Sequence, residues 1–334
     1  MPTIIDVANA AGVSTATVSR VLSGSGRVVA ETRARVLAAV ERLGYAPNVA
    51  ARSLRTTRAG KLLVTVPDIS NPFFSNVIRG AEAAARGIGY SVVLGDTRHD
   101  AAIENQYAEM LAKREVDGLI FLGHRLPDSL ATLVRASAGG APVVNGCEYS
   151  PGLDVPSVHI DNAGASEEAV AHLIGLGHRD IGIVTGPMAS PLGRDRVAGA
   201  RKAMAMHGLA DRLQIDHGDY SVEAGAAAAH RLLAGGVTAL FCCSDEMAMG
   251  ALSAIRATGR ICPTDISLVG FDDIRFARFL EPALTTIAQP QQEIGRETVR
   301  LLHLLITGQH AAATSVTLPY RLVVRDSTAP FQPR

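Results

Sequence analysis

The sequence predicts a small all-α head followed by an α/β core of two parallel-sheet subdomains. The first 45 residues contain three short stretches with helical spacing of apolar side chains, and glycines separate them. From residue 61 onward, short apolar runs alternate with longer amphipathic stretches, as in βαβ units. The chain has 334 residues, too many for one compact domain. Its composition, 47% hydrophobic and without tryptophan, suits a large buried core rather than a disordered chain.

The first predicted helix begins after Thr3. Thr3 can cap it, because Asp6 stands three residues later in a variant of the capping box. Apolar residues then recur at helical spacing and form one buried face: Ile4, Val7, Ala8 and Ala11. Gly12 ends the helix, since glycine tolerates the left-handed conformation of a tight turn.

The second predicted helix begins after Ser14, which can cap it. Its inward face consists of Val18, Val21 and Leu22. Its other face presents the residues that we predict to contact DNA: Ser14, Thr15, Ala16, Thr17 and Arg20.

The third predicted helix spans residues 31–43, and Gly44 ends it. Its predicted inward residues are Val36, Leu37, Val40 and Leu43. Two short helices joined by a turn with glycine, and a third that closes the core, are typical of a helix-turn-helix headpiece. In such a headpiece the second helix enters the major groove, where Arg20 can donate two hydrogen bonds to guanine. The alternative is a generic three-helix cap on a larger enzyme.

Residues 47–60 are predicted to form a hinge helix and linker. Small residues after Pro47 suit one or two helical turns, which are marginal alone and become ordered when docked on a partner. We predict that this segment contacts DNA, with Leu54 as an apolar wedge in the minor groove, and that the contacts are made by Asn48, Ala51, Leu54 and Arg55. The alternative is an ordinary linker with an incidental leucine.

The charge distribution supports a nucleic-acid partner for the head. The whole chain has a formal net charge of zero, which by itself argues against such a partner. Residues 1–60, however, contain eight arginines and three acids, a net charge of +5, and the remainder has a net charge of −5. A basic head on an acidic body is typical of proteins that bind nucleic acid through the head.

The body shows strand and helix signals in alternation. The predicted strands are 62–66, 91–94, 118–122, 143–145, 157–160, 181–185, 239–242 and 266–270. Helical spacing is found in residues 76–86, 102–113, 163–176 and 245–257, among others. Some 270 residues of this pattern exceed one sheet and indicate two similar subdomains, with ligands expected beyond the carboxyl ends of the strands.

No enzyme signature is found in the body. Dinucleotide-binding, phosphate-loop, serine-hydrolase and zinc-protease motifs are missing, and the paired carboxylates Asp272 and Asp273 have no candidate nucleophile beside them. The four cysteines form no C-x-x-C pair, so we expect buried thiols in a reducing compartment. The sequence shows no secretory signal and no apolar run of membrane-spanning length. We therefore expect a cytoplasmic protein with no catalytic residue, metal or cofactor.

Long ordered motifs resemble the lactose/galactose-repressor family (LacI/GalR). In the head they are Thr3–Ala8, Gly12–Leu22, Tyr45–Asn48 and Ala51–Leu54. In the body they include Pro67–Phe74, Val116–Gly118, His159–Asn162, Gly177–Arg179, Arg194–Gly199, Ser244–Gly250, Val269–Asp273 and Pro282–Ile287. The resemblance implies a DNA-binding transcriptional regulator with a periplasmic-binding-protein-like core of two Rossmann-like subdomains. Three strands are then expected to cross between these halves, with an effector in the cleft.

The implied domains are a headpiece at 1–46, a hinge at 47–60 and a core at 61–334. Within the core, the resemblance implies one subdomain of about 61–160 with a segment near 290–320, and another of about 161–289 with the C-terminal segment.

The resemblance also implies an effector site, residue by residue. Phe73 and Phe74 match the family's cleft aromatics, Arg196 its central arginine and Asp272 its hydroxyl-binding aspartate. An arginine and a facing carboxylate can bind vicinal hydroxyls, while an aromatic face covers a ring. Four further positions complete the expected site: Asn145, Asp161, Tyr220 and Gln289. Asn145 departs from the family, because several sugar-binding members carry aspartate there.

The expected effector is a nucleoside or a sugar. Segments such as Val155–Asn162 and Ile287–Pro290 most resemble a cytidine-responsive member of the family, which favours a nucleoside. The C-terminal residues lack the apolar heptads of a tetramerising coiled coil, so a homodimer on a pseudo-palindromic operator is expected. Two alternatives from other classes are an enzyme that acts on a nucleoside or sugar and a plain small-molecule carrier.

Overall fold

The computed structural model describes residues 2–22, 24, 28–45, 58–123, 126–137, 141–309 and 315–333. The chain divides into two units, Met1–Ala59 and Gly60–Arg334. The predicted hinge residues Asn48, Ala51, Leu54 and Arg55 lie outside the described residues. Among the described residues, no helix is long and apolar enough to cross a membrane.

The first unit is a three-helix headpiece. Its helices are α1 (Ile4–Ala11), α2 (Thr15–Leu22) and α3 (Ala30–Leu43). Thr3 and Asp6 form the predicted capping box, and Gly12 adopts the left-handed conformation after α1. The core of the unit consists of Val7, Ala8, Ala11, Val18, Val21, Val36 and Ala39.

The prediction that Leu37 faces the core is wrong, because this side chain is 48% exposed. Ala39 takes the inward position instead. It lies three residues from Val36, on the same face of the helix, whereas Leu37 is rotated by about 100° from Val36.

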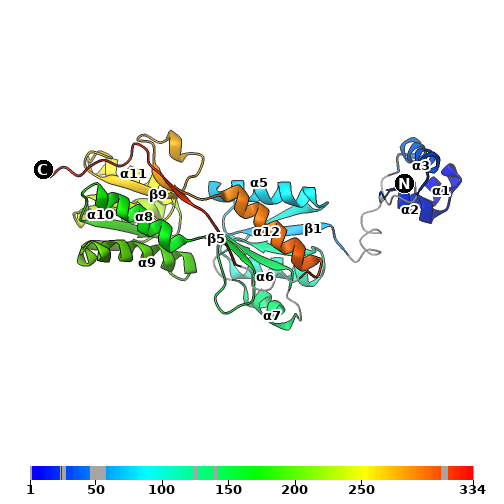
Figure 1. Cartoon of the computed structure of the whole chain (residues 1–334), viewed down its shortest axis with the longest axis horizontal. Helices are drawn as coiled ribbons and strands as arrows, with labels where there is room; N and C mark the ends of the chain where they lie inside the picture. The colour runs from blue at the N-terminus through cyan, green and yellow to red at the C-terminus, as the bar shows by residue number, and fades with distance from the viewer. Residues whose placement is uncertain are drawn as a thin grey trace. The chain divides into compact units, whose positions relative to one another are not determined.

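The second unit contains two six-stranded sheets of matching topology (Figure 1). The first sheet has the order β2-β1-β3-β4-β5-β11, with strands β1 (Lys61–Val66), β2 (Ser91–Asp96), β3 (Gly118–Phe121), β4 (Val143–Gly146), β5 (Ser157–Ile160) and β11 (Ser315–Leu318). The second has the order β7-β6-β8-β9-β10-β12, with strands β6 (Ile181–Thr185), β7 (Leu213–His217), β8 (Ala239–Cys242), β9 (Ser267–Asp272), β10 (Thr285–Ala288) and β12 (Arg321–Val323). All neighbouring strands are parallel except β10 and β12.

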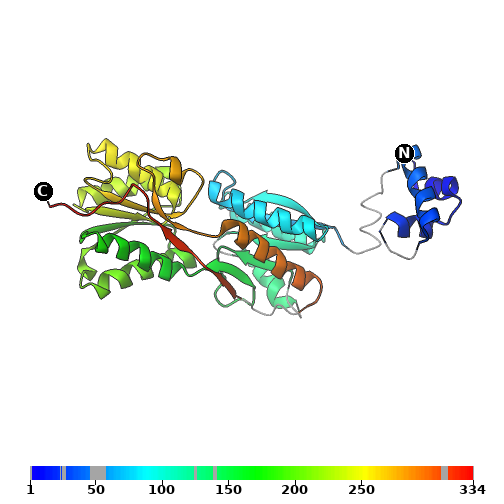
Figure 2. The same cartoon turned by 45° about the horizontal axis from the view of Figure 1, so that its top comes forward.

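Helices cover both faces of each sheet (Figure 2). The first sheet carries α5 (Pro72–Gly87), α6 (Ala101–Ala112), α7 (Asp128–Ala136) and α12 (Gln291–Ile306). The second carries α8 (Asn162–Gly175), α9 (Pro191–Met206), α10 (Val222–Ala234) and α11 (Asp245–Ala257). Helices α5 and α12 lie side by side, because Gly80 and Gly295 leave no Cβ between their backbones.

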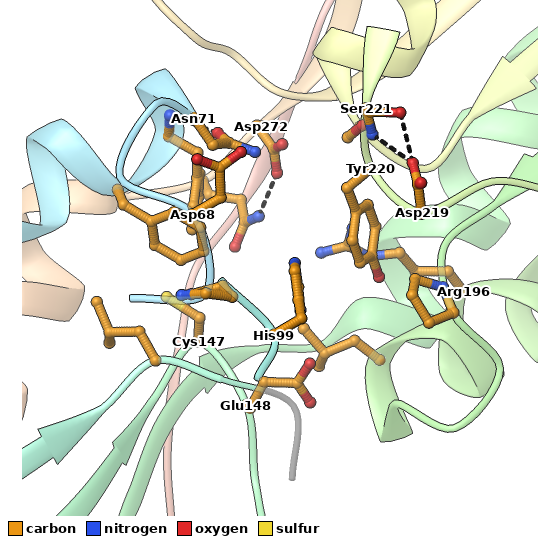
Figure 3. Close-up of a pocket in the computed structure, with 18 residues that line it drawn as sticks. Asp68, Asn71, His99, Cys147, Glu148, Arg196, Asp219, Tyr220, Ser221 and Asp272 are labelled. Atoms are coloured by element: carbon orange, nitrogen blue, oxygen red, sulfur yellow. Dashed lines mark hydrogen bonds between the residues drawn. The ribbon is translucent and has the colours of Figure 1, made fainter. Parts of the chain in front are cut away.

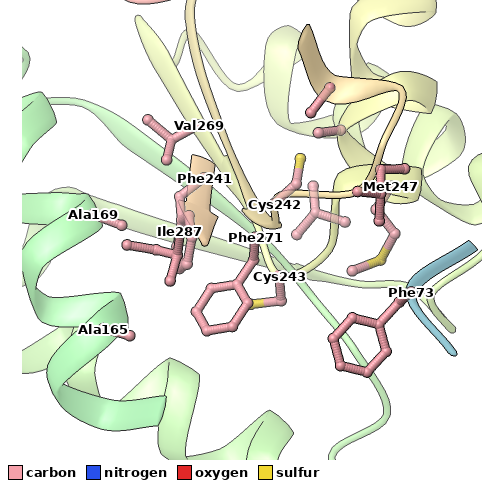
Figure 4. Packing of buried hydrophobic residues seen from close by; sticks show 14 of the residues in the cluster. Phe73, Ala165, Ala169, Phe241, Cys242, Cys243, Met247, Val269, Phe271 and Ile287 are labelled. Atoms are coloured by element: carbon pink, nitrogen blue, oxygen red, sulfur yellow. The ribbon is translucent and has the colours of Figure 1, made fainter. Parts of the chain in front are cut away.

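The chain passes between the two sheets three times, after β5, after β10 and after β11. Each sheet is therefore the framework of one subdomain, and the three crossings join the subdomains. The cores are strongly apolar: Figure 4 shows Phe241, Val269, Phe271 and Ile287 packed in the second subdomain. All four cysteines are buried and free.

Candidate functional site

The carboxyl ends of both sheets surround a cavity of about 590 Å³. Its lining residues follow the strands in turn. Those after strands of the first sheet are Pro67, Asp68, Asn71, Phe73, Phe74, His99, Leu122, Cys147 and Glu148. Those from the second are Pro187, Leu192, Arg196, Asp219, Tyr220, Ser221, Ser244, Asp272 and Gln289. Parallel α/β sheets bind ligands at such strand ends, and here two sets of ends lie across one cavity (Figure 3).

The backbone is strained where it meets the cavity. Four lining residues other than glycine have positive φ angles: His99 (55°), Cys147 (68°), Tyr220 (75°) and Asp272 (119°). Conformations of this kind cost about 1–3 kcal/mol each and cluster at ligand sites. The surrounding fold therefore holds these side chains in positions that an unstrained turn would not provide.

Arg196 is buried in the second subdomain and held in one orientation. Its Nε donates to Asn162 Oδ1 at 2.9 Å, and its Nη1 donates to the carbonyl oxygen of Cys243 at 2.6 Å. The guanidinium lies 3.7 Å from the centre of the Phe271 ring. Helix α9 positions it, because Ser190 caps the helix and Pro191 occupies its first position. These contacts preorganise a cation at the cavity wall.

Asp272 ends β9 and presents a second charged group. Gln289 Nε2 donates to its Oδ1 at 2.7 Å, and Gln291 Nε2 donates to its carbonyl oxygen at 2.7 Å. Burial raises the pKa of Asp272 to about 7, although Arg196 and Gln289 favour its charged form. Burial therefore favours the neutral form of this carboxyl, which can bind a hydroxyl group in either form.

Asp245 shows how a structural carboxyl differs from Asp272. Its Oδ1 accepts from Thr286 Oγ1 at 2.6 Å, and its Oδ2 accepts from the Ile274 backbone at 2.8 Å. Both oxygens are thus used by the fold, and Asp245 does not line the cavity. It stabilises the loop that follows Asp272 at the end of β9.

Aromatic side chains lie on both sides of the cavity. Phe73 and Phe74 begin α5, with ring centroids 5.2 Å apart in an edge-to-face arrangement. Asn71 caps this helix by accepting from the Phe73 backbone at 2.9 Å. Across the cavity, the ring of Tyr220 packs directly on Gly186, and its buried hydroxyl has no partner among the described residues. Burial raises the pKa of Tyr220, so this hydroxyl stays protonated.

The headpiece places its predicted DNA-contacting residues on α2. Ser14 caps the helix by accepting from the Thr17 backbone at 3.2 Å. Ser14, Thr15, Ala16 and Arg20 are exposed, whereas Val18 and Val21 are buried. The helix therefore presents a polar face of short side chains with one arginine.

Both units of the chain match known protein families. Residues 3–48 match the family described as bacterial regulatory proteins, lacI family, and residues 170–328 match the periplasmic binding protein-like domain. The chain is 41% identical over 329 residues to the HTH-type transcriptional repressor CytR of Escherichia coli K12, covering 98% of this chain and 96% of that protein. It is 36% identical to the HTH-type transcriptional regulator DegA of Bacillus subtilis 168, covering 98% of each.

The chain belongs to the lacI family of bacterial regulatory proteins. Among solved structures, the lac repressor dimer bound to operator and the anti-inducer ONPF matches with a TM-score of 0.86 and 30% identity over 98% of this chain and 99% of that one. The CelR–cellobiose complex matches with a TM-score of 0.73 and 34% identity over 98% of this chain and all of that one. The protein is thus a DNA-binding transcriptional regulator, and its named relatives are regulators rather than enzymes.

Six of the eight residues predicted for the effector site of this lacI-family protein lie at the cavity. They are Phe73, Phe74, Arg196, Tyr220, Asp272 and Gln289. The structure does not bring Asn145 or Asp161 to the cavity lining. Asn145 lies within β4, where it is buried and donates to Ser150 Oγ at 2.9 Å. Asp161 caps α8 by accepting from the Gly164 backbone at 2.9 Å.

Sequence reasoning missed several lining residues, of which Cys147 and Glu148 are the most informative. They follow β4 directly, two and three residues after Asn145. The signal that points to them is their place at the carboxyl end of a predicted strand. Among the described residues there is no group of three or more metal-ligating side chains.

Proposed function

We propose that this lacI-family regulator is a homodimeric repressor whose affinity for a pseudo-palindromic operator is controlled by a nucleoside or sugar in the cavity. The observation that carries this proposal is the pairing of Arg196 and Asp272 on one wall with the Phe73–Phe74 pair on the other. A preorganised guanidinium and carboxyl suit vicinal hydroxyls, and aromatic rings suit a planar base or a sugar face.

The mechanism follows from the position of the cavity between the subdomains. A ligand that bridges both walls stabilises one relative arrangement of the two subdomains, and it shifts the DNA-competent population by its differential affinity for the two states. A protein that acts on the chromosome works in the cytoplasm, where we place it. We infer that it is not an enzyme, so turnover of a nucleoside that disappears in Asp272→Ala would contradict the proposal.

A thermal-shift panel of nucleosides, purine bases and sugars tests the ligand class. A ligand of the cavity stabilises the folded protein by mass action, and Asp272→Ala should abolish the shift. Footprinting on the gene's own upstream region, with and without the stabilising ligand, then tests control of the operator. The proposal is wrong if no sequence-specific DNA binding is found there or across the genome.

The headpiece is tested by Arg20→Ala. We expect operator affinity to fall about 10- to 100-fold per half-site, because one bidentate contact to guanine contributes about 1–3 kcal/mol. Arg42→Ala, at the exposed end of α3, removes the same charge outside α2 and should cost far less. Equal losses for the two variants would show a purely electrostatic contact.

The hinge residues Asn48, Ala51, Leu54 and Arg55 are proposed to contact the minor groove. Leu54→Ala should weaken operator binding far more than effector binding. Unchanged operator affinity would rule out the wedge.

A further inference from the structure

Glu148 links the two subdomains at the edge of the cavity. It follows β4 of the first subdomain, and its side chain is buried, with 5% of the residue exposed. Ser190 Oγ donates to Glu148 Oε1 at 2.7 Å. Ser190 also caps α9 of the second subdomain by accepting from the Leu192 and Gly193 backbones. One oxygen of Glu148 is therefore bonded to the cap of the helix that carries Arg196.

The other oxygen of Glu148 has no partner. Oε2 is buried and makes no hydrogen bond with any described residue. Glu148 lines the cavity, so a ligand there can supply the missing partner (Figure 3). A buried polar atom without a partner is unfavourable, and ligand sites are where such atoms persist.

The protonation state of Glu148 is set by burial acting against its neighbours. The Ser190 hydroxyl, the Arg196 guanidinium and the Leu192 backbone amide favour the charged form, whereas Asp195 opposes it. The neutral side chains of Cys147, Tyr149 and Tyr220 also interact with Glu148. Burial is the dominant effect and raises the pKa of Glu148 to about 8.

We propose that Glu148 binds the effector as a neutral carboxylic acid, with Oε2 donating a hydrogen bond to an acceptor atom of an uncharged ligand while Oε1 links the subdomains through Ser190. This inference rests on the proposed function of the cavity. It assigns a specificity-determining role to a residue that the sequence did not single out. It also couples ligand recognition to the contact between the subdomains.

The charges around the cavity favour the same class of ligand. Four carboxyls line it, namely Asp68, Glu148, Asp219 and Asp272. Among the described lining residues, the guanidinium of Arg196 is the one permanent cation, and it is already bonded to Asn162 and Cys243. Even with Glu148 neutral, the carboxyls of Asp68, Asp219 and Asp272 outnumber this cation, so a phosphate group would meet more like charge than opposite charge. The cavity therefore suits nucleosides and free sugars rather than their phosphorylated forms.

Calorimetric titration of the full-length protein tests this inference. Cytidine, adenosine and ribose serve as uncharged probes, and cytidine 5′-monophosphate serves as the matched anion. For the tightest uncharged probe, affinity should fall about tenfold between about pH 7 and about pH 9, because only the neutral carboxyl donates and its population falls in that range. The monophosphate should bind at least about tenfold more weakly than cytidine at neutral pH.

Glu148→Gln is the decisive variant, because an amide donates and accepts at the same positions as a neutral acid. It should bind the probe within a few-fold of wild type at neutral pH and show no comparable fall at alkaline pH. Tyr149→Phe is the matched control, since it removes another contact between the subdomains, the 3.0 Å bond from Tyr149 to Asp195, and keeps the Glu148 carboxyl. This control should retain the alkaline fall.

Three results would overturn the role of Glu148: a wild-type affinity that is flat with pH, a glutamine variant with the same fall, or a glutamine variant that no longer binds at neutral pH. Equal binding of cytidine and its monophosphate would overturn the charge selection. If no uncharged probe binds at any pH, the proposed ligand class itself is wrong. This last outcome is distinct from binding with the wrong pH profile.

Discussion

The two walls of the cavity have the same architecture and different chemistry. The wall from the first subdomain contains the Phe73–Phe74 pair with Leu122 and Cys147. The wall from the second contains Arg196 and Asp272 beside the ring of Tyr220. Both are built from strand ends, loops and helix starts at the carboxyl edges of sheets of matching order. The difference therefore comes from the side chains at these positions and not from the fold, as expected where function is placed on a shared framework.

This comparison predicts how a ligand lies in the cavity. A planar ring is expected to face the aromatic wall, and hydroxyl groups are expected to face Arg196 and Asp272. Asp68 and Glu148 are carboxyls on the wall of the first subdomain, and Glu148 is bonded to Ser190 of the second. A ligand that contacts both walls at once therefore requires the relative arrangement of the two subdomains that brings the walls together.

Arg196→Met should have the largest effect. It removes the cation of the polar wall and leaves Asn162 Oδ1 and the Cys243 carbonyl without their donor. We expect effector affinity to fall at least about 30-fold, because losing one partner of a buried charged contact costs about 2–5 kcal/mol. Calorimetry measures the loss, and thermal unfolding reports the accompanying loss of stability.

The control for that variant is Arg194→Met. Arg194 lies on the same helix but is exposed, and among the described residues it bonds to the backbone carbonyls of Met188 and Ala189. Its loss should leave effector affinity nearly unchanged. Similar losses for the two variants would mean that the net charge of α9, and not the polar wall, controls binding.

Phe74→Leu should have an intermediate effect that depends on the ligand. Replacing the ring should weaken binding of a nucleoside about tenfold, since an aromatic contact contributes about 0.5–1.5 kcal/mol beyond its buried area. Binding of a free sugar should change less. Phe276→Leu, an exposed phenylalanine that does not line the cavity, is the control. If Phe74→Leu weakened nucleoside and sugar binding equally, the aromatic wall would not be specific for a planar base.

The sequence predicted the framework well and the walls in part. All eight predicted strands of the body exist. Seven of them are buried apolar runs, and the eighth, β2, is a partly exposed edge strand that still contains three consecutive apolar residues. The strands that were not predicted are β7, β10, β11 and β12. Of these, β7, β11 and β12 lie at sheet edges and are partly exposed, so their hydrophobic pattern is weak, whereas β10 is a buried strand of only four residues.

The site residues show the same limit. Arg196 and Asp272 stand in long family motifs, whereas Glu148 follows the strand that contains Asn145, the residue that the resemblance places at the cavity. Side chains alternate between the two faces of a strand, and the residues that reach the cavity lie at or beyond its carboxyl end. Ser190, which binds Oε1 of Glu148 and leaves Oε2 for a ligand, is 42 residues away in the chain. No local sequence pattern could therefore indicate the role of Glu148.

Ser190→Ala should have the smallest effect on effector affinity, and that effect reports specifically on the hydrogen bond between Ser190 and Glu148. The variant removes the cap of α9, which lowers the free energy of unfolding by about 1 kcal/mol. It also removes the hydrogen bond to Glu148, so effector affinity should fall a few-fold as well. Chemical denaturation and calorimetry measure the two effects separately.

Asp161→Ala is the matched cap variant. Asp161 caps α8 in the same subdomain but does not line the cavity, so the variant should lose similar stability and keep its effector affinity. A loss of affinity in Asp161→Ala equal to that in Ser190→Ala would show that any weakening of the second subdomain opens the cavity. An affinity loss confined to Ser190→Ala instead indicates that the two walls communicate through Glu148, because the two variants differ in whether the lost cap contacts the opposite subdomain.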